Sequence, residues 1–166
     1  MTATLLLLAA LFLVIACGVF VAAEFALVTV DRNKVDQAAA EGDAAAIGVQ
    51  SALRSLSTQL SGAQVGITLT NLGIGFLSEP AIADLIDEPL GAAGLPDAAV
   101  TPVALAVALS LSTIVTMLFG ELVPKNLAIA LPLATARATQ APMRFFTAAN
   151  KGPIRVLNGA ANALVR

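Results

Sequence analysis

The 166-residue sequence contains no tryptophan, tyrosine or histidine, and its only cysteine is Cys17. Without histidine, the chain has no imidazole for catalysis, metal ligation or pH sensing. A single cysteine excludes an intramolecular disulfide and a cysteine-based metal cluster. The missing tryptophan and tyrosine also mean that a membrane protein of this sequence would lack the usual aromatic belt.

Charged residues are scarce as well. They make up 12% of the chain, 58% of the residues are hydrophobic, and the mean hydropathy is +0.88. Because an ordinary soluble domain has about 25% charged residues, this composition indicates a multi-pass integral protein of the cell membrane. The net charge of −2 is too small to indicate nucleic-acid binding.

Three stretches carry few charges and are long enough to cross a bilayer as helices. They predict an all-α membrane protein whose spans cover residues 1–30, 55–84 and 98–124. The second stretch is rich in glycine, serine and threonine, a composition typical of helices that pack against protein inside a membrane. We interpret 1–166 as a single transmembrane domain.

The intervening segments fix the predicted orientation. Every lysine and arginine lies either in residues 31–54 or from Lys125 onward, whereas residues 85–97 form an acidic loop. By the positive-inside rule, the N-terminus and this loop lie outside, and the helical segment 31–54 is cytoplasmic. Residues 125–166 are predicted to form a kinked, amphipathic juxtamembrane belt against the cytoplasmic leaflet.

The most informative stretch ends the third span with Gly120, Glu121, Pro124 and Lys125. Proline has no N–H, so Pro124 cannot donate to the Gly120 carbonyl four residues earlier. A free carbonyl beside a carboxylate offers hard oxygen ligands to Mg²⁺, Ca²⁺ or Na⁺. Alternatively, Glu121 pairs with Lys125 at the membrane edge and Pro124 simply ends the helix.

Other polar groups occur inside the spans. Glu24 lies within the first apolar run, and an intramembrane carboxylate is a functional hypothesis by default; the alternative is a salt bridge to Lys125. The second span offers neutral oxygens on Thr68, Thr70 and Asn71, although helix packing with hydrogen bonds explains most of its polar residues.

Three motifs in order resemble one family. They are Phe-Val-Ala-Ala-Glu-Phe-Ala-Leu-Val (20–28), Gln-Val-Gly-Ile-Thr-Leu-Thr-Asn-Leu-Gly-Ile-Gly (64–75) and Phe-Gly-Glu-Leu-Val-Pro-Lys (119–125). Together they resemble the transmembrane domain of the CNNM/CorC family, which is associated with magnesium transport, chiefly efflux coupled to sodium. The resemblance covers nearly the whole chain.

The resemblance implies a homodimer with three spanning helices per protomer and an inward-facing cavity that holds Mg²⁺. Matching the motifs residue by residue gives Asn71, the Gly120 carbonyl and Glu121 as ligands of the transported Mg²⁺, with Na⁺ as a second candidate ion. Family members continue into cytoplasmic CBS modules that bind nucleotide. No such module lies in these 166 residues, which favours a domain of a longer protein.

One expected ligand is missing. The first motif commonly has a serine after its phenylalanine, and here Val21 and Ala22 follow instead. Either a retained water or another side chain takes its place, for which the candidates are Glu24, Thr68, Thr70 and Thr116, or this branch of the family prefers a different ion or binds Mg²⁺ more weakly.

Two functions follow from these residues. The leading one is a sodium-coupled Mg²⁺ transporter; the other is a membrane anchor and dimerisation module that holds a cytoplasmic regulatory domain. An anchor has no use for Asn71, Glu121 and a freed carbonyl together, which favours the transporter. An enzyme is disfavoured because the spans hold no nucleophile with an evident base and no paired aspartates.

Overall fold

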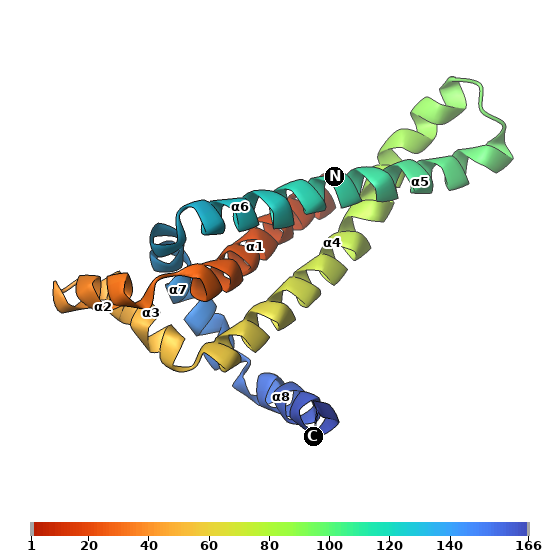
Figure 1. Ribbon diagram of the computed structural model, residues 1–166. Coiled ribbons are helices and arrows are strands. Elements are labelled where there is room, and N and C mark those ends of the chain that lie inside the picture. Colours follow the sequence, from red (N-terminus) through yellow and green to blue (C-terminus); the bar gives the residue numbers. More distant parts are fainter. Residues whose placement is uncertain (1, 166) are drawn as a thin grey trace.

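The computed structural model describes residues 2–165, and these are helical almost throughout (Figure 1). The elements are α1 (Thr2–Thr29), α2 (Arg32–Ala40), α3 (Ala44–Arg54), α4 (Leu56–Ala92), α5 (Asp97–Val115), the π-helical η1 (Thr116–Leu122), α6 (Val123–Ala130), α7 (Pro132–Ala149) and α8 (Lys151–Val165). No strand occurs in this described part of the chain. The predicted all-α fold is therefore confirmed.

Three helical rods are long and apolar enough to cross a membrane, at Ala3–Thr29, Leu56–Ala92 and Asp97–Ala130. Large apolar side chains such as Phe12, Leu72 and Phe76 point away from the protein, and Phe76 is 82% exposed. Such exposure is unfavourable in water but is what a lipid-facing surface requires. The chain is a multi-pass integral membrane protein.

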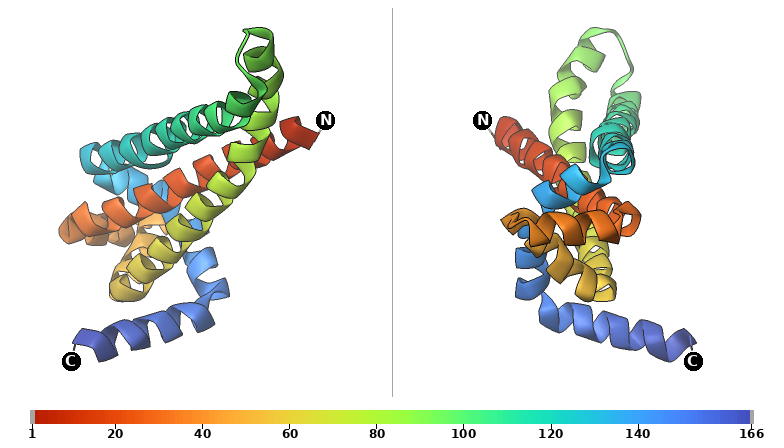
Figure 2. Two further views of the ribbon diagram at one scale, coloured as in Figure 1. Left: turned by 90° about the vertical axis from the view of Figure 1, so that its right-hand side faces the viewer. Right: turned by 60° about the vertical axis from the view of Figure 1, so that its left-hand side comes forward.

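The first rod is the centre of the fold. α1 packs along α4 on one side and, on another, along η1 and α6 of the continuous α5–η1–α6 rod (Figure 1). α4 and α5 form a hairpin that extends beyond the N-terminal end of α1, whereas α2, α3 and α7 gather at its opposite end. α8 lies to one side of the other helices and contacts α4 and α7 (Figure 2).

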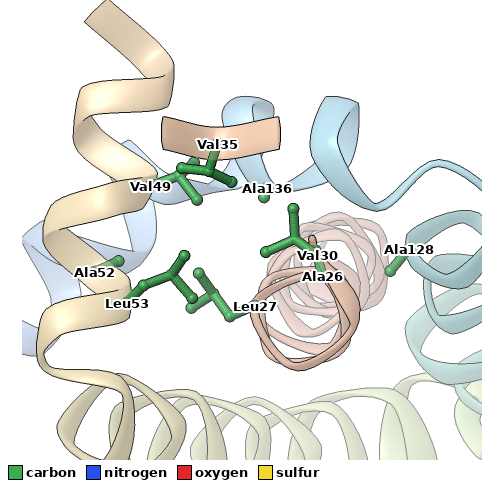
Figure 3. Close-up of a cluster of buried hydrophobic side chains, with 9 residues drawn as sticks. All are labelled: Ala26, Leu27, Val30, Val35, Val49, Ala52, Leu53, Ala128 and Ala136. Atoms are coloured by element: carbon green, nitrogen blue, oxygen red, sulfur yellow. The ribbon is translucent and has the colours of Figure 1, made fainter. Parts of the chain in front are cut away.

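The main apolar core lies where α1 ends. It brings α1, α2, α3, α6 and α7 together through small and branched side chains (Figure 3): Ala26, Leu27, Val30, Val35, Val49, Ala52, Leu53, Ala128 and Ala136. Val35 and Val49 are fully buried, so they hold the short helices α2 and α3 against α1. The polar segment 31–54 is thus anchored to the spans by its apolar face.

Two aspartates define the ends of these short helices. The Asp31 carboxylate accepts the Asn33 N–H at the start of α2, and Asp43 accepts the Ala45 and Ala46 N–H groups at the start of α3. Asp43 also forms an ion pair with Arg137 on α7. The sharp α2–α3 turn is thereby fixed to α7, the helix that follows the last spanning rod.

Glycines on α4 set its distance from the neighbouring helices. A Cβ at Gly66 would lie 2.7 Å from the Phe20 ring, and one at Gly73 would lie 2.6 Å from Leu13 Cδ1. Both contacts are with α1. Without a hydrophobic driving force between helices in lipid, this close van der Waals approach stabilises the pair.

The acidic segment 85–97 is more helical than predicted. α4 continues through Pro80 and Pro89 to Ala92, and the turn covers only residues 93–96. Packing explains the difference, because Ala83 of α4 meets Ala104 and Ala108 of α5 in a small core that stabilises the hairpin. A proline removes one hydrogen bond but does not end a helix that is held by such contacts.

The third span is also longer than predicted. Pro124 does not end it, because the helix changes to π-helical spacing at Thr116 and continues as α6 to Ala130. The belt predicted over 125–166 breaks instead at Leu131, whose φ is −131°, and at Asn150. Pro142 lies inside α7.

The α1–α4 contact predicts that Gly66→Ala destabilises the fold, because the new methyl group meets an aromatic ring held against Phe146 at 4.7 Å. We expect a loss of about 1–3 kcal/mol, measured as a lower midpoint of thermal unfolding in detergent. Gly91→Ala is the matched control on α4, since nothing lies within 4 Å of its Cβ position. Equal effects of both substitutions would contradict this packing.

Candidate cation site between α4 and η1

A cavity of about 370 Å³ opens between the middle of α4 and the rod formed by α5 and η1. Its lining includes two carboxylates, one amide and three hydroxyls, from Glu79, Glu121, Asn71, Ser112, Thr113 and Thr116. On α4, the groups recur every four residues at Asn71, Gly75 and Glu79, so they lie on one helical face. The cavity therefore lies between two spanning rods, and polar side chains from both rods line it.

The π-helical turn of η1 changes the backbone beside this cavity. The Val123 N–H donates to the Leu118 carbonyl, five residues earlier, and not to Phe119 as an α-helix would require. Pro124 has no N–H to offer to Phe119 or Gly120. Both carbonyls therefore lose their α-helical donors, and such π-helical turns are frequent at functional sites.

α1 supports this irregular turn from behind. A Cβ at Gly18 would lie 3.0 Å from Pro124 Cγ and 3.1 Å from the Phe119 carbonyl oxygen, so only glycine permits this contact. Gly120 is buried against Cys17, whose sulfur lies 3.5 Å from the Cβ position of the glycine. Small residues on both helices thus let η1 lie directly on α1.

Asn71 joins the three spans. Its Oδ1 accepts a hydrogen bond from the Cys17 thiol at 3.3 Å, and its Nδ2 donates to Glu121 Oε1 at 3.5 Å. The first contact fixes α4 to α1 and the second fixes α4 to η1. The predicted ligands Asn71 and Glu121 are therefore neighbours, although 50 residues separate them.

The remaining predicted ligands fall into two groups. Thr116 lines the cavity. Thr68 and Thr70 do not, because their hydroxyls donate to the Gln64 and Gly66 carbonyls of their own helix at 2.9 and 2.8 Å. Such local bonds satisfy a threonine in a helix and explain these two residues without an ion.

Glu24 also lies outside the cavity lining, on α1. Among the described residues, no ion pair within 4 Å joins Lys125 to Glu24 or Glu121. The Lys125 ammonium lies 4.8 Å above the centre of the Phe25 ring, a cation–π contact. In this structure, Lys125 thus does not pair with either carboxylate, contrary to the alternative considered for both.

Two participants were missed by the sequence analysis. Glu79 lies inside the second predicted span, 55–84, and was not among the predicted ligands, yet its carboxylate lies 3.4 Å from the Cβ position of Gly75 and lines the cavity. Its spacing of eight from Asn71 was the available signal. Cys17 was treated only as an isolated thiol, and no sequence pattern linked it to Asn71.

The comparison with known families decides the identity of the domain. Residues 8–166 match the family described as the cyclin M transmembrane N-terminal domain, CNNM. The chain belongs to this family. The resemblance inferred from the three motifs of this cyclin M domain is thereby confirmed.

Relatives of the domain occur in two bacteria. The chain is 45% identical over 160 residues to the UPF0053 protein MT1890 of Mycobacterium tuberculosis, covering 96% of this chain and 35% of that protein. It is 36% identical to the uncharacterized protein MT1889 of the same organism, covering 95% and 44%, and 39% identical to the UPF0053 protein YhdT of Bacillus subtilis, covering 87% and 32%. The cyclin M domain thus spans less than half the length of these relatives.

The packing of α1 against η1 predicts that Cys17 is protected from thiol reagents. Its relative exposure is 0%, between α4 and Gly120. We expect a membrane-permeant maleimide to react about a hundredfold more slowly with the folded protein than with the denatured chain, because reaction requires local opening. Labelling followed by mass spectrometry measures both rates; equal rates would contradict the contact between α1 and η1.

Proposed function

We propose that this cyclin M domain is a membrane cation transporter that moves Mg²⁺ outward against Na⁺ entry. Mg²⁺ is its substrate, bound by Asn71, Glu121 and the Gly120 carbonyl. The observation that carries the proposal is the meeting of the Asn71 amide and the Glu121 carboxylate at 3.5 Å beside a polar cavity within the spans. A structural anchor gains nothing from such groups at membrane depth, where polar groups are costly.

The chemistry of the lining supports a hard cation. Carboxylate, amide and hydroxyl oxygens suit Mg²⁺, Ca²⁺ and Na⁺, and they outnumber the one soft group of the cavity lining, the Met117 thioether. Mg²⁺ loses its water reluctantly, and a cavity of about 370 Å³ leaves room for retained waters beside the protein oxygens. We propose a partly hydrated ion.

The Asn71 amide supplies a switch between empty and loaded states. Its nitrogen now donates to Glu121 and its oxygen accepts from Cys17. A cation at Glu121 repels the amide N–H and attracts the oxygen, so we propose that the amide turns over when the ion binds. The Cys17 sulfur can accept a weak hydrogen bond from the turned amide, which lowers the free-energy cost of turning the amide.

Another residue can supply the oxygen ligand that the missing serine would have provided. Val21 packs with Cys17 and Ile74 in an apolar cluster, so this part of α1 offers no oxygen. Thr116, which lines the cavity one helical turn before Gly120, is the proposed substitute. Glu24 remains a candidate for proton or Na⁺ exchange; it lies seven residues after Cys17, on the same face of α1.

The cavity extends along α4 from Asn71 to Glu79, about 12 Å at 1.5 Å per residue. Glu79 lies on the side of the α4–α5 hairpin, which is outside in the predicted orientation. The family resemblance implies that the ion enters this cavity from the cytoplasm, and we propose that Glu79 lies further along the transport path, toward the outside. Glu79 then attracts the ion on its way out. A homodimer and regulation by CBS modules of the longer protein complete the proposal.

The first test of this function is Glu121→Gln. The substitution keeps the size and the hydrogen bond to Asn71 but removes the charge that binds the cation. We expect Mg²⁺ to raise the unfolding temperature of the wild-type protein and to have no effect on the variant, because a ligand stabilises only the state that it binds. Thermal unfolding with titrated Mg²⁺, Ca²⁺ and Na⁺ measures the response.

Asp84→Asn is the matched control, since Asp84 is an exposed carboxylate on α4 outside the cavity lining. Its Mg²⁺ response should equal that of the wild type. A Glu121→Gln variant that still responds would refute the site. Mg²⁺ binding without sodium-dependent flux in proteoliposomes would favour the anchor and dimerisation function instead.

A second test concerns the irregular turn. Pro124→Ala restores an N–H that can donate to the Gly120 carbonyl, so we expect a gain in stability of about 1 kcal/mol and a weaker Mg²⁺ response. Pro142→Ala, inside α7, restores a hydrogen bond away from the cavity and should leave the Mg²⁺ response unchanged. Thermal unfolding of both variants with and without Mg²⁺ separates the two effects; an unchanged response in Pro124→Ala excludes the carbonyl as a ligand.

A further inference from the structure

A second polar pocket, of about 700 Å³, lies at the opposite end of α4 from the hairpin. The start of α4, the end of α7 and the first residue of α8 line it. Its polar lining comprises two cations and several hydroxyl and amide groups, chiefly Arg144, Lys151, Ser55, Thr58, Gln59 and Gln140. No part of the proposed transport mechanism uses this pocket.

The charge of the pocket is uncompensated. No carboxylate is among its lining residues. Within the described chain, Arg144 and Lys151 form no ion pair. Arg137, two helical turns before Arg144 on α7, is instead paired with Asp43. Two neighbouring cations without an anion repel each other, and an anionic ligand between them removes this repulsion.

Neutral groups in the pocket are already arranged by the fold. The Arg144 guanidinium donates to Gln140 Oε1 at 3.4 Å, and Thr147 donates to Gln59 Oε1 at 3.2 Å, which ties α7 to α4 across the floor. Gln59 is buried, with a relative exposure of 7%. These contacts leave further N–H groups of the guanidinium available to a ligand.

The start of α4 adds to the positive potential. Ser55 is its N-cap residue but makes no capping hydrogen bond, since its hydroxyl donates to the Ala52 carbonyl. The positive end of a 37-residue helix dipole is therefore not neutralised by a cap side chain. The helix dipole adds a smaller positive potential to that of Arg144 and Lys151.

We propose that this pocket binds a phosphate group. A guanidinium donates two parallel hydrogen bonds to phosphate, and a lysine ammonium and hydroxyls complete a tetrahedral oxyanion shell. A phospholipid headgroup and soluble phosphate share this chemistry. Phe145, which also lines the pocket, is 78% exposed, as expected for a side chain that inserts into lipid beside a bound headgroup. In the predicted orientation, the pocket faces the cytoplasmic leaflet, where anionic lipids attract basic groups.

The experiment compares three variants of the chain in detergent: Arg144→Gln, Lys151→Gln and Arg155→Gln. Arg155 is exposed on α8, four residues after Lys151, and does not line the pocket, so it controls for general surface charge. Native mass spectrometry measures retention of phosphatidylglycerol against diacylglycerol of equal chain length, which has the same tails but no phosphate. Thermal unfolding with inorganic phosphate against chloride at equal ionic strength measures binding of the soluble ion.

We expect the wild-type protein and Arg155→Gln to prefer phosphatidylglycerol, and each pocket variant to bind it about tenfold more weakly. A pocket-dependent response to inorganic phosphate alone would also support the phosphate site and would identify a soluble ligand as its source. Equal losses in all three variants would reduce the effect to surface charge and overturn the proposal. So would the absence of any preference for phosphatidylglycerol or phosphate in the wild-type protein.

Discussion

The missing N–H of Pro124 is the constraint on which the arrangement of the last span depends. Because Pro124 cannot donate, the preceding turn adopts π-helical spacing and Val123 donates to Leu118. One extra residue in a turn rotates every following side chain by about 100°. The same event therefore decides which face of α6 meets the core, where Ala128 is buried, and which backbone groups lie near Glu121.

Such a turn persists only because α1 accommodates it. Gly18 leaves space for the Pro124 ring and the Phe119 carbonyl, and on another face Gly66 and Gly73 of α4 approach Phe20 and Leu13. α1 is therefore held between two close contacts, and its Cys17 thiol reaches Asn71 on the second of these helices. The contacts that pack α1 against α4 and η1 therefore also position the residues of the candidate cation site.

Long apolar stretches made the three spans predictable, because the length of an apolar run is set by the thickness of the bilayer. The pairing of Asn71 with Glu121 was accessible only through motif resemblance, since no local periodicity links residues on different helices. Glu79 was missed because a spacing of eight from Asn71 shows only a shared helical face and does not show that a cavity lies there. The Phe119 carbonyl was missed because α-helical spacing was assumed where the backbone is π-helical. The predicted orientation depends on charge distribution alone and remains a prediction.

The two polar regions share one helix. α4 begins beside the basic pocket at Ser55, carries Asn71 about 24 Å further along, and reaches Glu79 before its first proline, Pro80. The segment between the two regions has no proline, and three of its four glycines pack closely against α7 or α1, so we expect it to tilt as one rigid helix: Gly62, Gly66 and Gly73. A change in tilt at the start of α4 must therefore displace Asn71 relative to Glu121. A distance of 3.5 Å between these groups is sensitive to such a displacement, because hydrogen bonds and ion coordination both weaken steeply beyond this range.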